Sequence, residues 1–264
     1  MMDIAMATEQ PANRLQGTLY LVPAPLDFAC ESSCDLTQTL PLGTLQVAAR
    51  LQHWVCENAK STRAYLNRIH LVIPLSQPIA EQKLQELPRQ VCKKGDHHGQ
   101  LDARPLLQAA LMGHDMGLVS EAGMPAVADP GSSVVRAAHG LGIRVVPLVG
   151  PVSLLLALAA SGLNGQNFAF VGYLPVGVVE RSQRIKALEA LAIKTGQTQL
   201  FIETPYRNQA MLQSLLQTLR PDTRLAISSG LCLDRASTHS GPVKNWVHND
   251  VVNNSTPAVF AIGP

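Results

Sequence analysis

Aromatic residues are scarce in this chain of 264 residues: they make up 4% of it, within a hydrophobic content of 46%. A core with so few rings is built from leucine, valine, alanine and isoleucine, which suits parallel strands covered by helices. Charged residues are also few, at 15%, and the net charge is only +2. That balance does not indicate a dedicated nucleic-acid binder, although a sum over the chain hides any local basic patch. The composition predicts a globular protein with a large buried core.

Several familiar site motifs are missing. The five cysteines do not have the spacing of a zinc module, which predicts reduced thiols in a cytoplasmic protein. They are Cys30, Cys34, Cys56, Cys92 and Cys232. No Gly-x4-Gly-Lys-Ser/Thr loop occurs, and Gly140-Leu141-Gly142 precedes a predicted strand instead of following one, which argues against a nucleotide fingerprint. The absence of Gly-x-Ser-x-Gly argues against an α/β hydrolase.

Targeting, membrane and metal signals are weak as well. The first 16 residues have no basic region followed by an apolar one, which predicts no secretion signal. The most apolar window, residues 145–163, is interrupted by Pro147, Gly150 and Pro151, so we expect no membrane span. His97, His98, His114 and Asp115 do not form a clear ligand set, so we expect them to be solvated and expect no metal.

Alternating patterns of strand and helix predict an α/β protein with mainly parallel or mixed sheets. Hydrophobic periodicity predicts strands at 17–23, 70–75, 116–120, 143–148, 168–174, 199–204, 224–229 and 257–263. It predicts helices at 45–55, 62–68, 79–91, 105–112, 132–139, 151–162, 179–194 and 205–220. We expect a loose leader over residues 1–15, a first α/β domain over 16–148 and a second over 149–264.

The most informative stretch is Leu118 to Pro151. It contains two irregular loops, 120–131 and 149–153, and each follows the end of a predicted strand. In open α/β sheets ligands bind at that edge. Both loops are rich in glycine and proline and lack lysine and arginine, so they present main-chain groups to a ligand at close range. The pattern predicts a cofactor pocket.

Five motifs carry a resemblance to a known family. They are VPAPL (22–26), SEAGMPAVADPG (120–131), PLVGPVS (147–153), FAFVGYLP (168–175) and FIETPYRN (201–208). Their order and spacing resemble those of the tetrapyrrole methylase superfamily. The residues of these motifs are most similar to those of the bacterial branch that methylates a cytidine ribose 2′-oxygen in small-subunit ribosomal RNA. The resemblance implies two α/β domains, S-adenosylmethionine in the cleft between them, a homodimer and an RNA substrate.

The resemblance also implies which residues bind the cofactor. These are Pro25, Leu26, Ser120, Gly123, Met124, Ala126, Val127, Ala128, Val152, Ser153, Leu154 and Ser229. Val127 and Ala128 are expected to sandwich the adenine, and Ser153 to meet the amino-acid end. A loop without cationic side chains tolerates the positive sulfur of the cofactor. Gly123-Met124-Pro125 stands where tetrapyrrole methylases proper have Gly-Asp-Pro, as it does in the ribosomal branch.

The expected catalytic residues are Glu203, Arg207 and Glu57. The first two match a Glu-Ser/Thr-x-x-Arg run of the branch, and the alternative for Glu203 is a solvated residue in a first helical turn. Glu57 is the first residue of the segment that corresponds to a Glu-Asp-Thr-Arg run of the branch. This segment reads Glu57-Asn58-Ala59-Lys60 in this chain. Glu121 and Asp129 are further candidates to hold the cofactor, with a helix cap as the alternative for Asp129.

Three functions remain open at this point. The first is methylation of ribosomal RNA. The second is methylation of a tetrapyrrole or another small molecule, against which the missing Gly-Asp-Pro argues. The third is a catalytically silent protein that binds S-adenosylmethionine, which the altered run at 57–60 favours.

Overall fold

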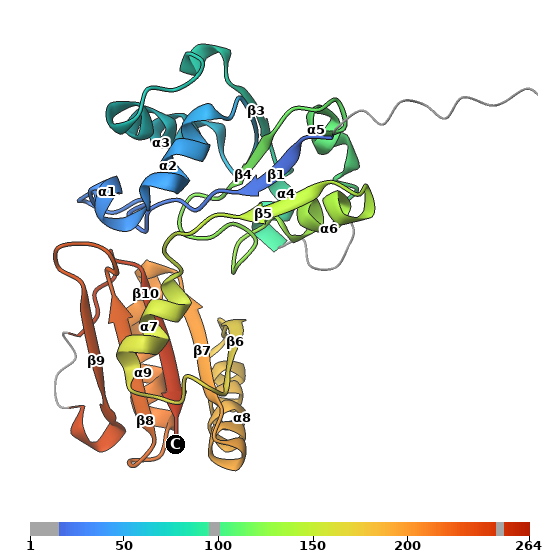
Figure 1. Cartoon of the computed structure of the whole chain (residues 1–264). Coiled ribbons are helices and arrows are strands. Elements are labelled where there is room, and N and C mark those ends of the chain that lie inside the picture. Colours follow the sequence, from blue (N-terminus) through green and yellow to red (C-terminus); the bar gives the residue numbers. More distant parts are fainter. Residues whose placement is uncertain (1–15, 95–100, 247–250) are drawn as a thin grey trace, which may run out of the picture.

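The computed structural model describes residues 16–94, 101–246 and 251–264, so the predicted leader and His97 and His98 lie outside the described residues. Two lobes follow one another along the chain, and each is built on its own five-stranded sheet within the described residues (Figure 1). The chain leaves the first sheet at Pro147 and enters the first helix of the second lobe at Ser153. The domain boundary between 148 and 149 stays a prediction.

The first sheet is wholly parallel, with the strand order β3-β2-β4-β1-β5. Its strands are β1 (Thr18–Leu21), β2 (His53–Cys56), β3 (Lys83–Glu86), β4 (Met116–Val119) and β5 (Arg144–Pro147). The α-helices between them are α1 (Leu36–Thr39), α2 (Leu42–Arg50), α3 (Ala59–Val72), α4 (Arg89–Lys94), α5 (Gln108–Leu111) and α6 (Ser132–Gly140). Two 3-10 helices, η1 (Ile79–Glu81) and η2 (Arg104–Leu107), complete the lobe.

Both faces of the first sheet are covered, because successive residues of a strand point to opposite sides. Trp54 and Cys56 of β2 pack in the cluster that includes α2 and α3, whereas Val55 belongs to the cluster on the other face with α6. Such burial on both sides explains why the central strands are continuously apolar.

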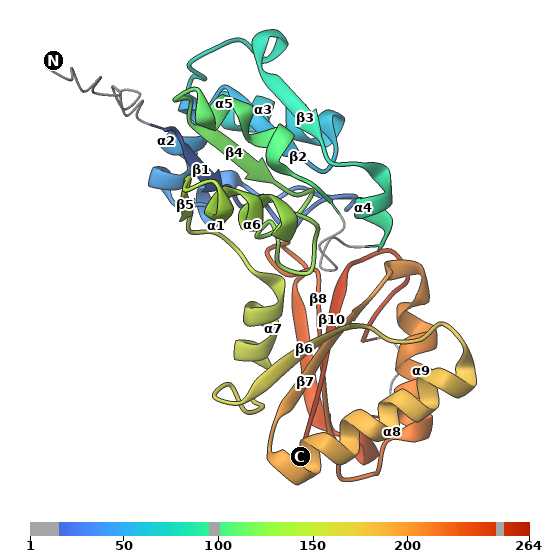
Figure 2. The same ribbon diagram turned by 90° about the vertical axis from the view of Figure 1, so that its right-hand side faces the viewer.

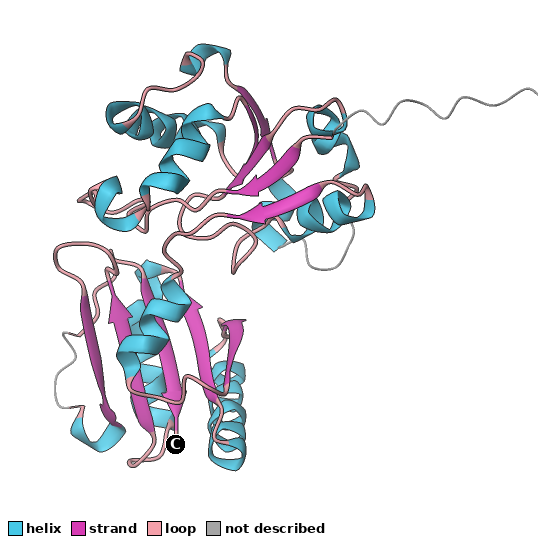
Figure 3. Cartoon of the chain, in the orientation of Figure 1, coloured by secondary structure: helices cyan, strands magenta, loops and turns pink. Residues whose placement is uncertain are grey.

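The second sheet is mixed, with the order β6-β7-β10-β8-β9. β6 pairs with β7 in parallel, and the other pairs are antiparallel. The strands are β6 (Phe168–Tyr173), β7 (Thr198–Glu203), β8 (Arg224–Ser229), β9 (Ser237–Pro242) and β10 (Ala258–Gly263). The helices are α7 (Ser153–Ser161), α8 (Val178–Thr195) and α9 (Asn208–Thr218), with the 3-10 helices η3 (Pro205–Arg207) and η4 (Val243–Asn245) (Figure 3).

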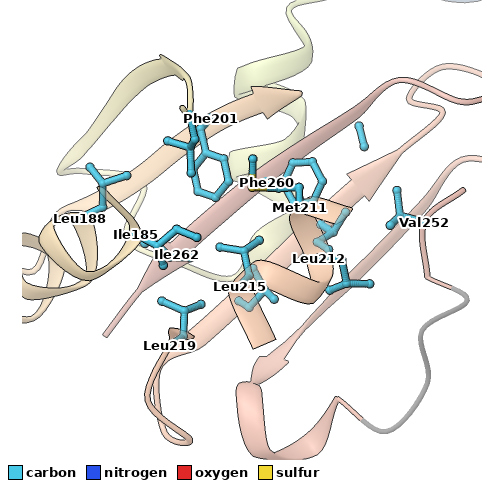
Figure 4. Close-up of a cluster of buried hydrophobic side chains, with 14 of the residues drawn as sticks. Ile185, Leu188, Phe201, Met211, Leu212, Leu215, Leu219, Val252, Phe260 and Ile262 are labelled. Carbon is cyan, nitrogen blue, oxygen red and sulfur yellow. The ribbon is translucent and has the colours of Figure 1, made fainter. Parts of the chain in front are cut away.

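The second lobe also has a core on each face of its sheet. Phe201, Phe260 and Ile262 pack with α8 and α9, and the two rings stack with centroids 5.6 Å apart (Figure 4). Val259 and Ala261, the alternate residues of β10, pack on the other face with Leu154, Ala157 and Leu158 of α7. Figure 2 shows α7 on one side of this sheet and α8 with α9 on the other.

Three predicted elements of the first lobe are wrong. The helix predicted over 45–55 ends at Arg50 and is followed by β2, and the strand predicted over 70–75 falls at the end of α3. The helix predicted over 79–91 is η1, then β3, then α4. Strands of four residues give too short a pattern to separate from a helix, and β3 alternates weakly because it lies at the sheet edge.

Within the described residues, no helix combines the length and the apolar character that crossing a membrane requires.

Candidate active site between the lobes

Three loops meet at the carboxyl edge of the first sheet, after the adjacent strands β4, β1 and β5. The loop after β1 and the loop after β4 pair through their backbones. Ala24 N–H donates to the Gly123 carbonyl at 2.9 Å, and Gly123 N–H donates to the Ala24 carbonyl at 3.0 Å. The loop after β5 packs so closely that a Cβ on Gly150 would lie 2.3 Å from Pro23 Cγ. The motifs predicted to act together are therefore joined physically.

The 120–131 loop has an unusual backbone. Gly123, Ala126 and Ala128 have positive φ values of 69°, 64° and 66°. Glycine adopts this left-handed region freely, but for alanine it is uncommon and costs on the order of 1 kcal/mol. Strain of this kind gathers at ligand sites, where it positions main-chain groups.

A pocket of about 270 Å³ lies between the lobes beside this loop, and we name it the seam pocket. The first lobe contributes Leu26, Phe28, 122–124 and 127–129, and the second contributes 152–154, Tyr173, 202–205, 228, 230–231 and 257–259. Lysine and arginine are absent from this lining of described residues, whereas the carboxylates of Asp129 and Glu203 are present. A cavity with this charge suits a cationic ligand.

Most of the predicted cofactor residues line the seam pocket: Leu26, Gly123, Met124, Val127, Ala128, Val152, Ser153 and Leu154. Four others lie elsewhere. Pro25 and Ser120 line an adjoining pocket, Ala126 lies within the strained loop without lining either pocket, and Ser229 lies between the lining residues Ser228 and Gly230.

Sequence reasoning missed much of the second-lobe wall. Tyr173, Leu231 and residues 257–259 belong to it, together with Phe28 of the first lobe. Tyr173 ends β6 and Gly230 directly follows β8, so the ends of strands were the available signal. The antiparallel pairing of β10 with β8, which brings 257–259 next to Gly230, could not be inferred from periodicity.

Glu203 and Arg207 form a buried ion pair at the end of β7. Arg207 Nη2 donates to Glu203 Oε1 at 2.6 Å, with the Glu203 side chain 0% and the Arg207 side chain 20% exposed. The same Oε1 accepts the Thr204 N–H at 2.7 Å. Glu203 Oε2 and Arg207 Nε are buried and have no hydrogen-bond partner among the described residues. The alternative of a solvated Glu203 is wrong, because its side chain is buried and one of its oxygens is held by Arg207.

Three carboxyl groups gather beside the strained loop. The Glu121 N–H donates to Glu57 Oε2 at 3.3 Å, and burial raises the pKa of both glutamates. Burial and the charges of Glu57 and Glu121 raise the pKa of Asp129 to about 7. Helix α6 begins at Ser132 with Gly131 as its N-cap, so Asp129 lies outside the helix and faces the seam pocket. Glu57, predicted to be catalytic, does not line the seam pocket, although its charge acts on Asp129.

The adjoining pocket, named the first-lobe pocket, has a volume of about 440 Å³. It lies over the carboxyl ends of β1, β2 and β4 and is lined by residues from 24–29, 58–68 and 119–121. Arg68 donates to both oxygens of Asp27, at 3.1 and 2.9 Å. Burial alone would raise the pKa of Asp27, but the bonds from Arg68 and from the Cys34 N–H outweigh it and lower this pKa. The Arg68–Asp27 pair thus forms a charge-balanced wall.

The altered run at 57–60 has a plain structural role. Asn58 caps α3, because its Oδ1 accepts the N–H groups of Lys60 at 2.9 Å and Ser61 at 3.3 Å. Asparagine is as good an N-cap as the aspartate of the related motif. Lys60 lines the first-lobe pocket, so a cation is kept there as well.

A metal site is not apparent: no group of three or more His, Cys, Asp or Glu side chains suited to a metal ion gathers in the described part of the chain. Cys30, Cys34 and Cys232 are free thiols.

Comparison with known proteins identifies the family. A ribosomal RNA small subunit methyltransferase I of Mesorhizobium japonicum is 34% identical over 225 residues, which cover 85% of this chain and 67% of that protein. The protein of the same name from Escherichia coli O157:H7 is 30% identical over 248 residues, covering 93% and 77%. This chain belongs to the ribosomal RNA small subunit methyltransferase I family. No protein-family model matches the chain.

Solved structures agree at the level of the fold. The crystal structure of uroporphyrin-III-C-methyltransferase from Thermus thermophilus matches with a TM-score of 0.51 and 17% identity, covering 94% of each chain. The methyltransferase CobJ matches with a TM-score of 0.55 and 15% identity over the same shares. The predicted tetrapyrrole methylase fold and the assignment to S-adenosylmethionine-dependent methyltransferases are confirmed. The individual site residues stay predictions.

Proposed function

We propose that this protein transfers a methyl group from S-adenosylmethionine, bound in the seam pocket, to a ribose 2′-oxygen of a cytidine in small-subunit ribosomal RNA. The observation that carries the cofactor site is the lining of that pocket, which combines strained main-chain loops and two carboxylates without any lysine or arginine. The relatives' name, which specifies small-subunit ribosomal RNA, supports the acceptor.

The residues present fit this cofactor. Glu203 Oε2 is a buried acceptor without a partner among the described residues, and it suits a cofactor ammonium or hydroxyl group. Gly123 has a φ of 69° and a Cβ there would lie 3.2 Å from Leu26 Cδ2, so a larger residue does not fit at this position of the pocket lining without strain. Val127, Ala128 and Leu154 offer apolar contacts to an adenine.

When bound, S-adenosylmethionine supplies an electrophilic methyl group on a positively charged sulfur. The loops after β1, β4 and β5 orient donor and acceptor, and alignment of this kind contributes most of the rate in a direct displacement. Asp129 takes up the proton of the acceptor hydroxyl, because a carboxyl group with a pKa near 7 is well matched to proton transfer at neutral pH. Glu57 and Glu121 act through Asp129 by raising its pKa, and the Glu203–Arg207 pair positions the 204–207 segment.

Transfer of a radioactive methyl group tests this proposal. The purified protein is incubated with tritiated S-adenosylmethionine and small ribosomal subunits from a strain that lacks the gene. The RNA is then digested to nucleosides and analysed by mass spectrometry. Label in 2′-O-methylcytidine is expected. Label on a base, on protein, or only on an added porphyrin would refute the RNA ribose as acceptor.

A silent cofactor-binding protein is the second candidate, since the run at 57–60 departs from the related motif. The structure weakens this interpretation, because Asn58 preserves the cap of α3 and Lys60 preserves a cation. Calorimetric binding of S-adenosylhomocysteine without label in any fraction would favour it.

We further propose a homodimer in the cytoplasm, as the family resemblance implies. Leu155 and Leu156 of α7 are 50% and 40% exposed, on the side of the helix that faces away from the sheet. Replacing both with aspartate is expected to convert a dimer into a monomer in light-scattering chromatography, with Leu191→Asp on α8 as the matched control at another exposed leucine. A monomeric wild type would refute the dimer.

A further inference from the structure

We infer that the first-lobe pocket binds the acceptor nucleoside, splayed out of a single-stranded RNA, while the neighbouring helix α3 binds its phosphate. This inference rests on the proposed function and adds to it the place where the RNA is held. The first-lobe pocket is assigned from its position, its charge and its lining.

The two pockets adjoin, as donor and acceptor sites must. Phe28 lines both of them. Ser120 and Glu121 line the first-lobe pocket, and residues 122–124 and 127–129 of the same loop line the seam pocket. A group held in the first-lobe pocket therefore lies against the loop that carries the proposed proton acceptor.

Charge separates the roles of the two pockets. The seam pocket has carboxylates and no cationic lining residue, which favours the sulfonium cofactor. The first-lobe pocket has the cations Lys60 and Arg68 as well as the carboxyl groups of Asp27 and Glu121, and Arg68 is paired with Asp27. Lys60 has no ion-pair partner among the described residues, and neither does Arg63, which follows it by three residues and so lies on the same face of α3. Both side chains are exposed, Lys60 in the lining of the first-lobe pocket and Arg63 outside it, and both suit a phosphate.

The lining also suits a nucleoside. Phe28 is 41% exposed, so its ring offers a surface on which a base stacks, as in the recognition of single-stranded RNA. Ser61 and Glu121 are hydrogen-bonded to one another at 3.2 Å and provide polar atoms beside it. A volume of about 440 Å³ is near the lower end of the roughly 300–1000 Å³ that small-molecule pockets span, and it fits one nucleoside.

Filling the pocket gives the first test. Ala64 lines the first-lobe pocket from the exposed side of α3 and does not line the seam pocket, so Ala64→Trp blocks one pocket alone. The matched control is Ala187→Trp at an exposed position of α8. Affinity for a fluorescent single-stranded RNA of the target sequence is measured by anisotropy, and affinity for S-adenosylhomocysteine by calorimetry. Ala64→Trp is expected to weaken RNA binding about tenfold or more, as loss of one stacked base does, and to leave cofactor affinity unchanged.

Reversing the charge of Lys60 gives the second test. Lys60→Glu is expected to weaken RNA binding and to flatten its dependence on salt, lowering the slope of log K against log salt by about 0.7 for each phosphate that the protein no longer neutralises. Arg144→Glu is the control, because Arg144 begins β5 at the opposite edge of the first sheet and is exposed. The salt slope reports neutralisation of phosphates directly, which a merely structural role of Lys60 would not change.

The outcomes separate this inference from the proposed function. If the wild type methylates RNA and Ala64→Trp binds and methylates it equally well, the first-lobe pocket is not the acceptor site and the proposed function stands. If the wild type binds the cofactor but neither binds nor methylates the RNA, both the RNA acceptor and this pocket assignment are wrong. Equal loss of cofactor affinity in Ala64→Trp would also overturn the division between the two pockets.

Discussion

Asp129 faces the seam pocket with a pKa of about 7, against an ordinary value of 3.8, because burial and the charges of Glu57 and Glu121 disfavour its ionised form. The folded protein therefore keeps a proton that the unfolded chain releases. This contribution to stability is complete below about pH 3.8 and is lost as the pH rises through 7. Such a carboxyl group lowers the stability of the folded protein at neutral pH. Carboxyl groups with raised pKa values of this kind are common at functional sites.

Asp129→Asn is expected to raise stability and lower activity. At pH 8 the free energy of unfolding of the variant should be about 1–2 kcal/mol higher than that of the wild type. A fully enclosed group would contribute roughly 1.4 kcal/mol for each unit by which its pKa is raised, but Asp129 is partly exposed and contributes less. Methyl transfer should fall about 100-fold with the proton acceptor removed. Urea unfolding at pH 5 and pH 8 checks the first point. A gain of the same size at both pH values would mean that Asp129 does not titrate between them.

Glu203 allows its catalytic and structural roles to be separated. Glu203→Gln leaves the Arg207 guanidinium, 20% exposed, without its counter-charge, and the free energy of unfolding should fall by about 3 kcal/mol. The double variant Glu203→Gln with Arg207→Met should regain most of that stability. If Glu203 Oε2 contacts the cofactor, the double variant should still bind S-adenosylhomocysteine more weakly in calorimetry. Full recovery of cofactor affinity would restrict Glu203 to the ion pair.

Residue patterns predict the glycine-rich part of this site well and its carboxyl groups poorly. Gly123, Val127 and Ser153 can be predicted because their loops directly follow strongly apolar strands. The distinction between Glu57, which does not line the pocket, and Asp129, which does, depends on how residues 64 or more positions apart pack together. No local pattern contains that information.

The sequence predicts buried central strands better than it predicts strands at the edges of the sheets. β4 and β10 are buried throughout, and their apolar runs predict strands. β3 and β9 lie at sheet edges and contain mostly polar residues, so the pattern predicts a helix at β3 and nothing at β9. Edge strands are held by backbone pairing with a neighbour that is distant in sequence, as β2 holds β3. Their side chains therefore carry little signal.

Gly117 of β4 packs tightly against the side chain of Trp54. A Cβ on Gly117 would lie 2.4 Å from Trp54 Cε3 in a fully buried contact. Gly117→Ala should therefore lower the free energy of unfolding by about 2–3 kcal/mol through overpacking. Gly43→Ala on α2 meets nothing within 4 Å and should raise it by about 0.5–1 kcal/mol, since glycine is a poor helix former. Urea unfolding of both variants measures the difference. Equal stabilities would show that the Trp54 ring can move aside.

The seam pocket, proposed as the cofactor site, is lined by residues of both lobes, so a ligand bound there contacts both of them. The seam pocket takes residues from the loops of the first sheet and from the ends of β6, β7 and β8 in the second. Neither lobe contains a complete site, so ligand binding should stabilise the pair. Each sheet has its own core on both faces, so we expect each lobe to be stable in itself.

Thermal unfolding measures this coupling. S-adenosylhomocysteine at about 100 times its dissociation constant should add about 2.7 kcal/mol to the stability of the folded protein, which corresponds to a rise of roughly 5–10 °C in Tm for a chain of this size. Both lobes should then unfold in one transition, because the ligand contacts both. Gly123→Arg places a long cation at a position with φ of 69° beside Leu26, so it should unfold near the ligand-free wild type and gain nothing from the ligand. A ligand-dependent rise in Tm that persists in Gly123→Arg would place the cofactor outside the seam pocket.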